Sequence, residues 1–226
     1  MQLIIGNKNY SSWSMRPWVL MRALGLPFEE VKLRLEFGAD SSFRRAVAGH
    51  SPAGKVPVLH LDDGFAVWDT LAIAETLAEH FPQAGVWPTE ARARARARSL
   101  CAEMHSGFGA LRSHCPMNIE ARLAEVGARL WAEQAAVRAD VERIEAIWAD
   151  ALAGSGGPFL FSDFGATDAF FAPVVMRLRN YALPVQATSQ AYIERLVAHP
   201  AVAAWIADAL TEQDFLADDE PYRTQR

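Results

Sequence analysis

Two periodicities divide the first third of the chain. A short apolar run at 2–6 predicts a strand, and the segment 28–35 alternates apolar and polar side chains, as a half-buried strand does. Between them, residues 15–25 repeat apolar positions with helical spacing. Pro17 falls in the first turn of that helix, where its missing N–H costs little, and Gly25 is a typical stop. The pattern predicts strand, helix, strand.

Residues 41–81 continue with shorter elements. A short helix or turn is expected at 41–49, and two apolar runs at 55–61 and 65–68 flank Asp-Asp-Gly, a strong hairpin signal. A helix with one apolar face follows at 70–81. Because a helix joins the first two strands, we expect them to be parallel, whereas the last two strands form a hairpin.

Beyond a segment rich in Pro and Gly at 82–90, helical periods dominate. A buried central helix is predicted at 166–181, because its apolar run is too long for a strand. Two helices, parted near His199 and Pro200, are predicted at 189–210. One continuous helical face is predicted before them, with apolar positions Leu130, Val137, Val141, Ile144 and Trp148.

The chain is therefore expected to hold an α/β domain over 1–82 and an all-helical domain over 90–226. Of its 226 residues, 51% are hydrophobic and 22% charged, enough to build sizeable cores. The net charge of −5 argues against nucleic acid or an anionic membrane as a partner. No apolar run approaches the roughly 20 residues that span a bilayer, and no signal peptide is apparent. We expect a cytoplasmic protein.

Three motifs carry a family resemblance. The segments "SSWSMRPW" at 11–18, "SPAGKVPVL" at 51–59 and "WDTLAIAETLAEHFP" at 68–82 precede an all-helical half. In this order they resemble the cytosolic glutathione transferases, and the zeta-like branch with its serine-rich first loop is the most similar. The resemblance implies an α+β protein, in which a thioredoxin-like first domain binds glutathione and the helical domain holds a second substrate.

Pro57 begins a strand-like run, although proline lacks the N–H that a central strand donates. An edge or a turn would explain it from the sequence alone. The resemblance implies instead a cis bond between Val56 and Pro57, with the Val56 backbone pairing with the cysteinyl main chain of glutathione. Lys55 precedes the turn and could reach a ligand carboxylate, although an exposed lysine is usually just solvated.

Asp69 and Thr70 stand where the helix at 70–81 begins. Either side chain is suited to cap that helix, and the free N–H groups there also bind anions. The resemblance implies that Asp69 pairs with the γ-glutamyl ammonium of glutathione and that Thr70 binds its carboxylate. Aspartate reaches one methylene less far than the glutamate or glutamine common in the family.

Three serines crowd the start of the first helix. A thiol with an ordinary pKa near 8.5 is only about 3% thiolate at pH 7, and a hydroxyl that donates to the thiolate lowers this pKa. At least one serine should cap the helix, and Ser14, just before the helical run, is the expected cap. The resemblance gives Ser11 the thiolate-stabilising role, but Trp13 replaces the usual cysteine, so Ser12 remains a competitor. Arg16 also follows the motif and is expected to contact glutathione or the second substrate.

The second-substrate pocket is expected on the first long helix of the helical domain. Its face combines apolar and basic side chains, which suggests an anionic or polar electrophile. A buried core face would explain the apolar ones equally well. No metal-ligand spacing occurs, and Cys101 and Cys115 are expected to be small core residues. The candidate pocket residues are Trp13, Met104, His105, Phe108 and Arg112.

Two functions remain open. The first is a glutathione transferase that conjugates a small electrophile or isomerises a maleyl-type substrate, with glutathione as co-substrate and no metal. The second is a non-catalytic binding or scaffold protein of the same fold. The resemblance also implies a homodimer. The arginines of "ARARARARS" at 91–99 would need carboxylates nearby or water, and "LDDG" or the C-terminal "FLADDEPY" could supply carboxylates.

Overall fold

The computed structural model describes all residues, Met1–Arg226. Its first part is a four-stranded sheet in the order β2-β1-β3-β4, with β1 and β2 parallel and the other pairs antiparallel. The predicted order of elements, the parallel pair and the hairpin are thus confirmed. The elements are β1 (Gln2–Ile5), α1 (Ser12–Ala23), β2 (Glu29–Lys32), α2 (Ser42–Ala48), β3 (Val58–His60), β4 (Ala66–Trp68) and α3 (Thr70–His80).

The central strand β1 explains the short apolar run at the N-terminus. Its residues Leu3, Ile4 and Ile5 are fully buried, as expected for a strand covered on both faces. The second strand is shorter than predicted. Beyond Lys32 the chain leaves the sheet, and the N–H of Leu35 donates to the side chain of Asn7 at 2.8 Å.

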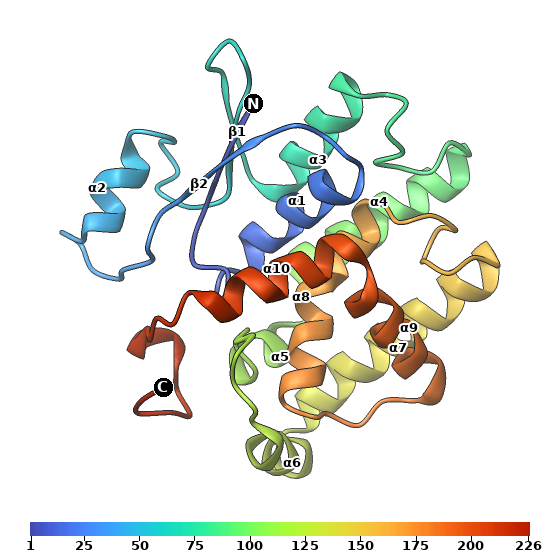
Figure 1. Cartoon of the computed structure of the whole chain (residues 1–226). Helices are drawn as coiled ribbons and strands as arrows, with labels where there is room; N and C mark the ends of the chain where they lie inside the picture. Colours follow the sequence, from blue (N-terminus) through green and yellow to red (C-terminus); the bar gives the residue numbers. More distant parts are fainter.

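The rest of the chain is helical, which confirms the predicted fold class. Helix α8 is nearly all buried, with Arg179 its one exposed residue, and it packs against α1 and α4 in the middle of the molecule (Figure 1). No helix is both long enough and apolar enough to cross a bilayer. The elements are α4 (Ala91–Ser106), α5 (Gly109–His114), α6 (Ala124–Glu133), α7 (Ala135–Ser155), α8 (Ala166–Asn180), α9 (Ala187–Ala198), α10 (Pro200–Thr211) and a 3₁₀ turn, η1 (Ala217–Asp219).

The predicted continuous helix around 129–148 is wrong, because the chain breaks at Gln134. No Gly or Pro marks this break. The guanidinium of Arg138, one turn into α7, donates to the carbonyls of Trp131 and Ala132 and so satisfies the end of α6. The five predicted apolar positions are nevertheless all buried.

A second break separates α4 from α5. Gly107 ends α4, and Phe108 adopts a left-handed backbone with φ 57°. A side chain on Gly107 would lie 2.7 Å from the carbonyl oxygen of Glu103, so a glycine fits this end. Arg112 donates back to the carbonyls of His105 and Gly107, which stabilises the turn.

The arginines at the start of α4 find other partners than the acidic segments predicted for them. Arg98 forms a bidentate ion pair with Glu75 of α3 at 2.7 Å. Arg94 caps the preceding loop through two carbonyls, whereas Arg92 and Arg96 are exposed and have no partner in the chain. The carboxylates of the acidic tail instead accept hydrogen bonds from the loop between β1 and α1.

The two halves share one hydrophobic core. Helix α10 packs on α1, and the C-terminal segment (residues 212–226) then returns to the side of the sheet (Figure 1). Its carboxylates reach the loop between β1 and α1: Glu212 accepts from the backbone of Lys8, and Asp214 from the side chain of Asn7. The loop and the tail are therefore neighbours although they lie at opposite ends of the sequence.

Candidate functional site

A cleft of about 1000 Å³ opens between the two halves. Its walls come from the loop before α1, the turn before β3, the start of α3, the α4–α5 junction and the C-terminal segment. Ten of the thirteen predicted site residues line it: Ser11, Ser12, Trp13, Lys55, Val56, Pro57, Asp69, Thr70, His105 and Arg112. Arg16, Met104 and Phe108 do not.

The serine that caps α1 is Ser11, and the prediction of Ser14 is wrong. The Ser11 Oγ accepts from the Ser14 N–H at 3.4 Å and lies 2.7 Å from the Ser14 Oγ. The Ser14 Oγ also accepts from the Gly6 N–H at 3.1 Å. The helix begins two residues before Ser14, because Ser12 and Trp13 already have helical geometry.

Ser11 and Ser12 differ in how free their hydroxyls are. Ser11 is 8% exposed and bonded to Ser14, whereas the half-buried Ser12 hydroxyl has no partner in the chain. Because a hydroxyl proton rotates, the Ser11–Ser14 bond can run in either direction. When Ser14 donates, the Ser11 proton is left for a ligand in the cleft. Both serines can therefore donate to an anion at this end.

The turn before β3 presents backbone groups to the cleft. The bond between Val56 and Pro57 is cis, as the family resemblance implies. Neither the N–H nor the carbonyl of Val56 has a backbone partner, so both are available to an extended ligand. Lys55 beside it is exposed and unpaired.

Asp69 and Thr70 form the N-terminus of α3, as predicted. The Asp69 Oδ1 accepts from the N–H of Leu71 at 2.9 Å and so caps the helix. The Thr70 hydroxyl is buried and has no hydrogen-bond partner. A buried hydroxyl without a partner at a helix N-terminus, in the wall of a cleft, is suited to bind a carboxylate.

His105 closes the cleft opposite Asp69. Its Nε2 lies 3.4 Å from the Asp69 Oδ2, and its ring packs edge-on against Trp13 with centroids 4.9 Å apart. Burial lowers the pKa of His105, and the nearby Asp69 only partly opposes this. A neutral imidazole here leaves the second Asp69 oxygen open to a cationic ligand group.

Three arginines gather at the inner end of the cleft, and none is paired with a carboxylate. Arg112 and Arg177 line it, and Arg16 lies behind with its guanidinium 4.2 Å from the Trp13 ring centre. Burial, followed by the neighbouring Arg112, lowers the pKa of Arg16 to about 9 and that of Arg177 to about 10. The Nε and Nη1 of Arg16 are buried without a partner. In a protein of net charge −5, this concentration of positive charge favours an anionic ligand.

Met104 and Phe108 belong to the hydrophobic core, at 2% and 6% exposure. The single helical face that would have brought them to the pocket is interrupted at Gly107. Of the four helical residues predicted for the pocket, His105 and Arg112 line the cleft. Cys101 and Cys115 are buried, and burial raises the pKa of each thiol to about 12. No group of His, Cys, Asp and Glu side chains is arranged to hold a metal ion.

Three titratable side chains of the cleft were not predicted from the sequence. Tyr10 precedes the serine pair, Arg177 comes from the central helix α8, and Asp219 from η1. A signal existed for Arg177, because a guanidinium inside an apolar helix needs an explanation. Nothing local marks Asp219, since only the path of the tail brings it here. Burial, and then Asp218 and Glu220, raise the pKa of Asp219 to about 6.

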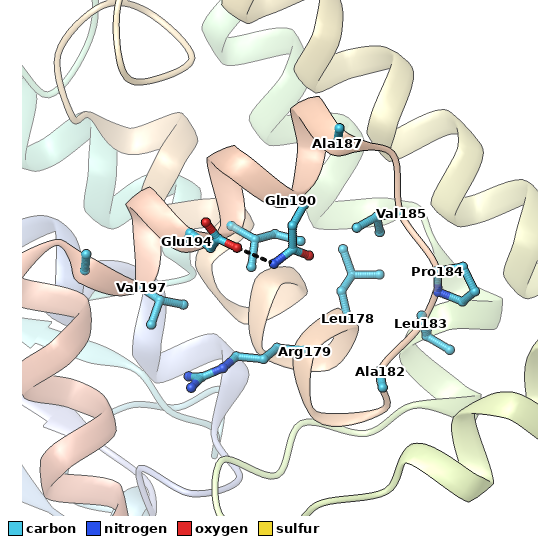
Figure 2. Close-up of a pocket in the computed structure, with 12 residues that line it drawn as sticks. Leu178, Arg179, Ala182, Leu183, Pro184, Val185, Ala187, Gln190, Glu194 and Val197 are labelled. Atoms are coloured by element: carbon cyan, nitrogen blue, oxygen red, sulfur yellow. Dashed lines mark hydrogen bonds between the residues drawn. The ribbon is translucent and has the colours of Figure 1, made fainter.

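A second hollow of about 830 Å³ lies between the end of α8 and α9 (Figure 2). Most of its lining is aliphatic. Its polar groups are Arg179 and the pair Gln190 and Glu194, which bond to each other at 2.8 Å. This second hollow has no concentration of polar groups without partners. The cleft between the two halves is therefore the candidate site.

Comparison with known proteins identifies two matching family models. "Glutathione S-transferase, N-terminal domain" matches residues 10–80, and "Glutathione S-transferase, C-terminal domain" matches residues 90–208. No curated protein matches the chain.

Solved structures similar to this chain extend over nearly its whole length. A glutathione transferase homologue from Burkholderia gl BGR1 with bound glutathione is 26% identical, covers 93% of this chain and 98% of its own, and has a TM-score of 0.67. A sphingomonad glutathione S-transferase complexed with glutathione is 23% identical, with 92% and 98% covered and a TM-score of 0.65. A bacterial maleyl pyruvate isomerase of the zeta class is 21% identical, with 91% and 96% covered and a TM-score of 0.67.

Proposed function

The chain belongs to the glutathione S-transferase family, and from this premise we propose that it binds glutathione in the cleft and presents the sulfur as a thiolate to a small electrophile. The observation that carries the proposal is that two helix N-termini, those of α1 and α3, open on one cleft with hydroxyls available to anions. The Burkholderia homologue, which has bound glutathione, supports the same ligand.

Glutathione would lie extended between these two N-termini. Its γ-glutamyl carboxylate meets the Thr70 hydroxyl and the N-terminus of α3, and its ammonium meets the Asp69 Oδ2, beside the His105 Nε2. Its cysteinyl main chain pairs with the open backbone groups of Val56. Lys55, exposed on the same turn and lining the cleft, would meet the glycyl carboxylate. Together these contacts give every charged group of glutathione a partner. A charge that is buried without one would be strongly unfavourable.

The thiol then reaches the N-terminus of α1. Lowering its pKa from about 8.5 by two units turns about 3% thiolate at pH 7 into about three-quarters, a differential stabilisation of about 2.7 kcal/mol. A hydroxyl donor to an anion and the positive end of a helix are together of that size. We assign the donor role to Ser11 and keep Ser12 as its competitor. In this role the Ser11 hydroxyl turns from Ser14 to the sulfur, and the Ser14 hydroxyl donates to Ser11 instead.

The electrophile is proposed to carry a carboxylate. Arg112 and Arg177 line the cleft without a carboxylate partner, and Arg16 adds positive charge behind Trp13. Maleyl-type substrates, isomerised by addition of the thiolate to a cis double bond, rotation and elimination, have this charge. The zeta-like assignment rests on the serine loop and on the three arginines at the cleft.

A homodimer is part of the proposal. Phe65 and Trp68 lie on the hairpin that forms one edge of the sheet and are 64% and 43% exposed. Arg92 and Arg96 on α4 lack partners in the chain. Exposed aromatics and unpaired arginines are typical of interfaces. Sedimentation should give about twice the chain mass of 24.9 kDa. A mass near that of one chain would overturn the dimer.

An electrophile panel tests the function. Glutathione turnover is measured with an aryl halide, a hydroperoxide and a maleyl-type cis-enone acid, and binding is measured on immobilised glutathione. We expect retention on glutathione and the highest kcat/KM with the enone acid. Retention without turnover of any electrophile would instead favour a non-catalytic binding protein of this fold. Loss of retention would overturn both functions.

A further inference from the structure

The loop before the serine pair is polar yet buried. Asn7, Lys8, Asn9 and Tyr10 are 4%, 3%, 2% and 6% exposed. Burying four consecutive residues of this kind is unfavourable unless their polar groups have partners. Their partners therefore show what holds the loop in place.

Several of those partners come from the end of the chain, and others come from β2 and the segment 118–120. The Glu212 carboxylate accepts from the backbone N–H groups of Lys8 at 2.8 Å and Asn9 at 3.1 Å. The Lys8 Nζ forms ion pairs with Asp208 at 2.6 Å and Glu30 at 2.7 Å. A carboxylate that accepts from two successive N–H groups fixes the backbone between them.

Asn7 connects this attachment to the serines. Its carbonyl accepts from the N–H groups of Tyr10 at 3.2 Å and Ser11 at 2.8 Å, which forms the turn into α1. Its side chain donates to Asp214 at 3.2 Å and accepts from Leu35. A shift of the tail would therefore move the peptide that carries Ser11.

Tyr10 is the link nearest the cleft. Its hydroxyl donates to the Glu220 Oε1 at 2.7 Å, and its carbonyl accepts from the Ser12 N–H at 2.9 Å. Glu220 also accepts from Asn118 at 2.7 Å and from Arg223. Tyr10 thus joins a side-chain bond to the tail with a backbone bond to the serine pair.

The Glu220 bond persists over the neutral pH range. Burial alone would raise the pKa of Glu220, but hydrogen bonds from Arg223, Tyr10 and Asn118 outweigh it and lower the pKa. Burial and then Glu220 raise the pKa of Tyr10 to about 12, so the phenol keeps its proton. A protonated phenol and an ionised carboxylate form a short, charge-assisted bond.

We propose that Tyr10 and Glu220 are positioning residues for the thiolate, with the C-terminal segment setting the orientation of the Ser11 and Ser12 hydroxyls through the Tyr10–Glu220 bond. This rests on the proposed serine mechanism. Neither residue needs to touch the sulfur. Hydrogen bonds weaken steeply with misalignment, so a small rotation of the loop reduces the stabilisation of the thiolate.

Tyr10→Phe and Glu220→Ala test the proposal, because the first removes only a hydroxyl and the second removes its acceptor, together with the bonds from Asn118 and Arg223. We expect each to raise the thiol pKa of bound glutathione and to lower kcat/KM near pH 6.5 by about threefold or more. The deficit should shrink at high pH, where the thiol ionises without help. Glu220→Gln keeps an acceptor for Tyr10 and should restore part of the loss.

Binding of S-methylglutathione, which has no thiol, should change less than about twofold in all three variants, because its other contacts remain. Arg143→Gln is the control. It breaks the exposed Arg143–Glu103 pair between α7 and α4, which contacts neither the loop nor the cleft, and should change neither the thiol pKa nor kcat/KM.

The outcomes distinguish failure of the positioning role of the tail from failure of the serine mechanism. If the wild type lowers the thiol pKa and both Tyr10→Phe and Glu220→Ala leave it unchanged while only lowering Tm, the tail is merely structural and the inference is overturned. If the wild type does not lower the thiol pKa of glutathione, the serine mechanism itself fails before any tail variant is considered.

Discussion

Two helices begin at the same cleft, but their N-termini are held in different ways. The N-terminus of α1 follows a buried loop whose polar groups are bonded to the C-terminal segment. The N-terminus of α3 depends on its own cap, Asp69, which has a left-handed backbone with φ 75° and a half-exposed side chain. Contacts with the distant C-terminal segment thus hold the start of α1, whereas the start of α3 is held by its own capping residue.

The difference suits two kinds of ligand chemistry. Stabilising a thiolate needs a donor at a fixed distance and angle, because the gain comes from one strong hydrogen bond. Holding a flexible carboxylate needs only accessible donors and a favourable dipole, and the free hydroxyl of Thr70 provides these. The first end should therefore control turnover, and the second should control affinity.

Replacing Ser11 should have the largest effect. We expect Ser11→Gly to reduce turnover by about tenfold or more, since a hydrogen bond to an anion contributes about 1.5–3 kcal/mol. Glycine is preferred to alanine here because it keeps acceptable cap geometry and costs α1 only a few tenths of a kcal/mol. Steady-state kinetics at saturating glutathione measure the loss.

Ser12→Ala is the matched comparison for that variant. Its hydroxyl lines the same cleft but takes no part in the cap of α1. We expect a smaller effect on turnover than from Ser11→Gly. The reverse order, with Ser12→Ala damaging and Ser11→Gly silent, would transfer the thiolate role to Ser12.

Replacing Thr70 tests the other end of the cleft. Thr70→Val keeps the shape and removes the hydroxyl, and should raise the glutathione KM by about fivefold with turnover at saturation nearly unchanged. Thr76→Val, on the same helix but outside the cleft, serves as the control. Equal KM values for the wild type and Thr70→Val would leave Thr70 with a structural role alone.

The electrophile end is tested by the charge of the substrate. Arg112→Gln should raise the KM of a carboxylate-bearing electrophile by about threefold and leave that of a neutral aryl halide within experimental error. The guanidinium also closes the α4–α5 turn, so Tm is measured in parallel. An equal change for both electrophiles would remove the argument for an anionic substrate.

The sequence predicted the first half of this molecule better than the second. Strand, turn and cap signals at Pro17, Gly25 and Asp69 are local, so they identify their elements without knowledge of the rest. The break at Gln134 has no local signal, because it is stabilised by Arg138 binding the end of α6. The break at Gly107 has a local signal, the glycine itself. Helical spacing of the residues on both sides made this signal easy to miss.

The same distinction applies to the site. Ser11, Val56, Asp69 and Thr70 lie in motifs that stand next to recognisable helix or strand starts. Asp219 reaches the cleft only through the path of the C-terminal segment, which periodicity does not reveal. The prediction of Ser14 as the cap of α1 is wrong because the helix begins at Ser12, before the apolar run that starts at Met15. Long-range packing thus determines the part of the cleft wall that comes from the helical half of the chain.

Asp219 should have the smallest effect, and the effect should depend on pH. Its folded pKa of about 6 lies above its ordinary value of 3.8, so the unfolded chain releases this proton first and stability falls as pH rises between these values. Asp219→Asn should therefore raise Tm relative to the wild type above pH 6 and not near pH 3.5. Thermal melts across this range measure it.

A Tm difference for Asp219→Asn that does not vary with pH would contradict the raised pKa. Because Asp219 lies in the cleft with Arg177, its ionisation also opposes an anionic electrophile. The KM of a carboxylate-bearing electrophile should fall by about twofold in the variant at pH 7.5, and the glutathione KM should not change.

The central claim is that the N-terminus of α1 ionises the thiol of bound glutathione through Ser11. Titrating the near-ultraviolet thiolate absorbance of glutathione bound to the wild type and to Ser11→Gly tests it most directly. The account predicts a bound thiol pKa about two units below that of free glutathione, returning most of the way in Ser11→Gly. Equal pKa values for the two proteins, or a wild-type value no lower than that of free glutathione, would contradict it.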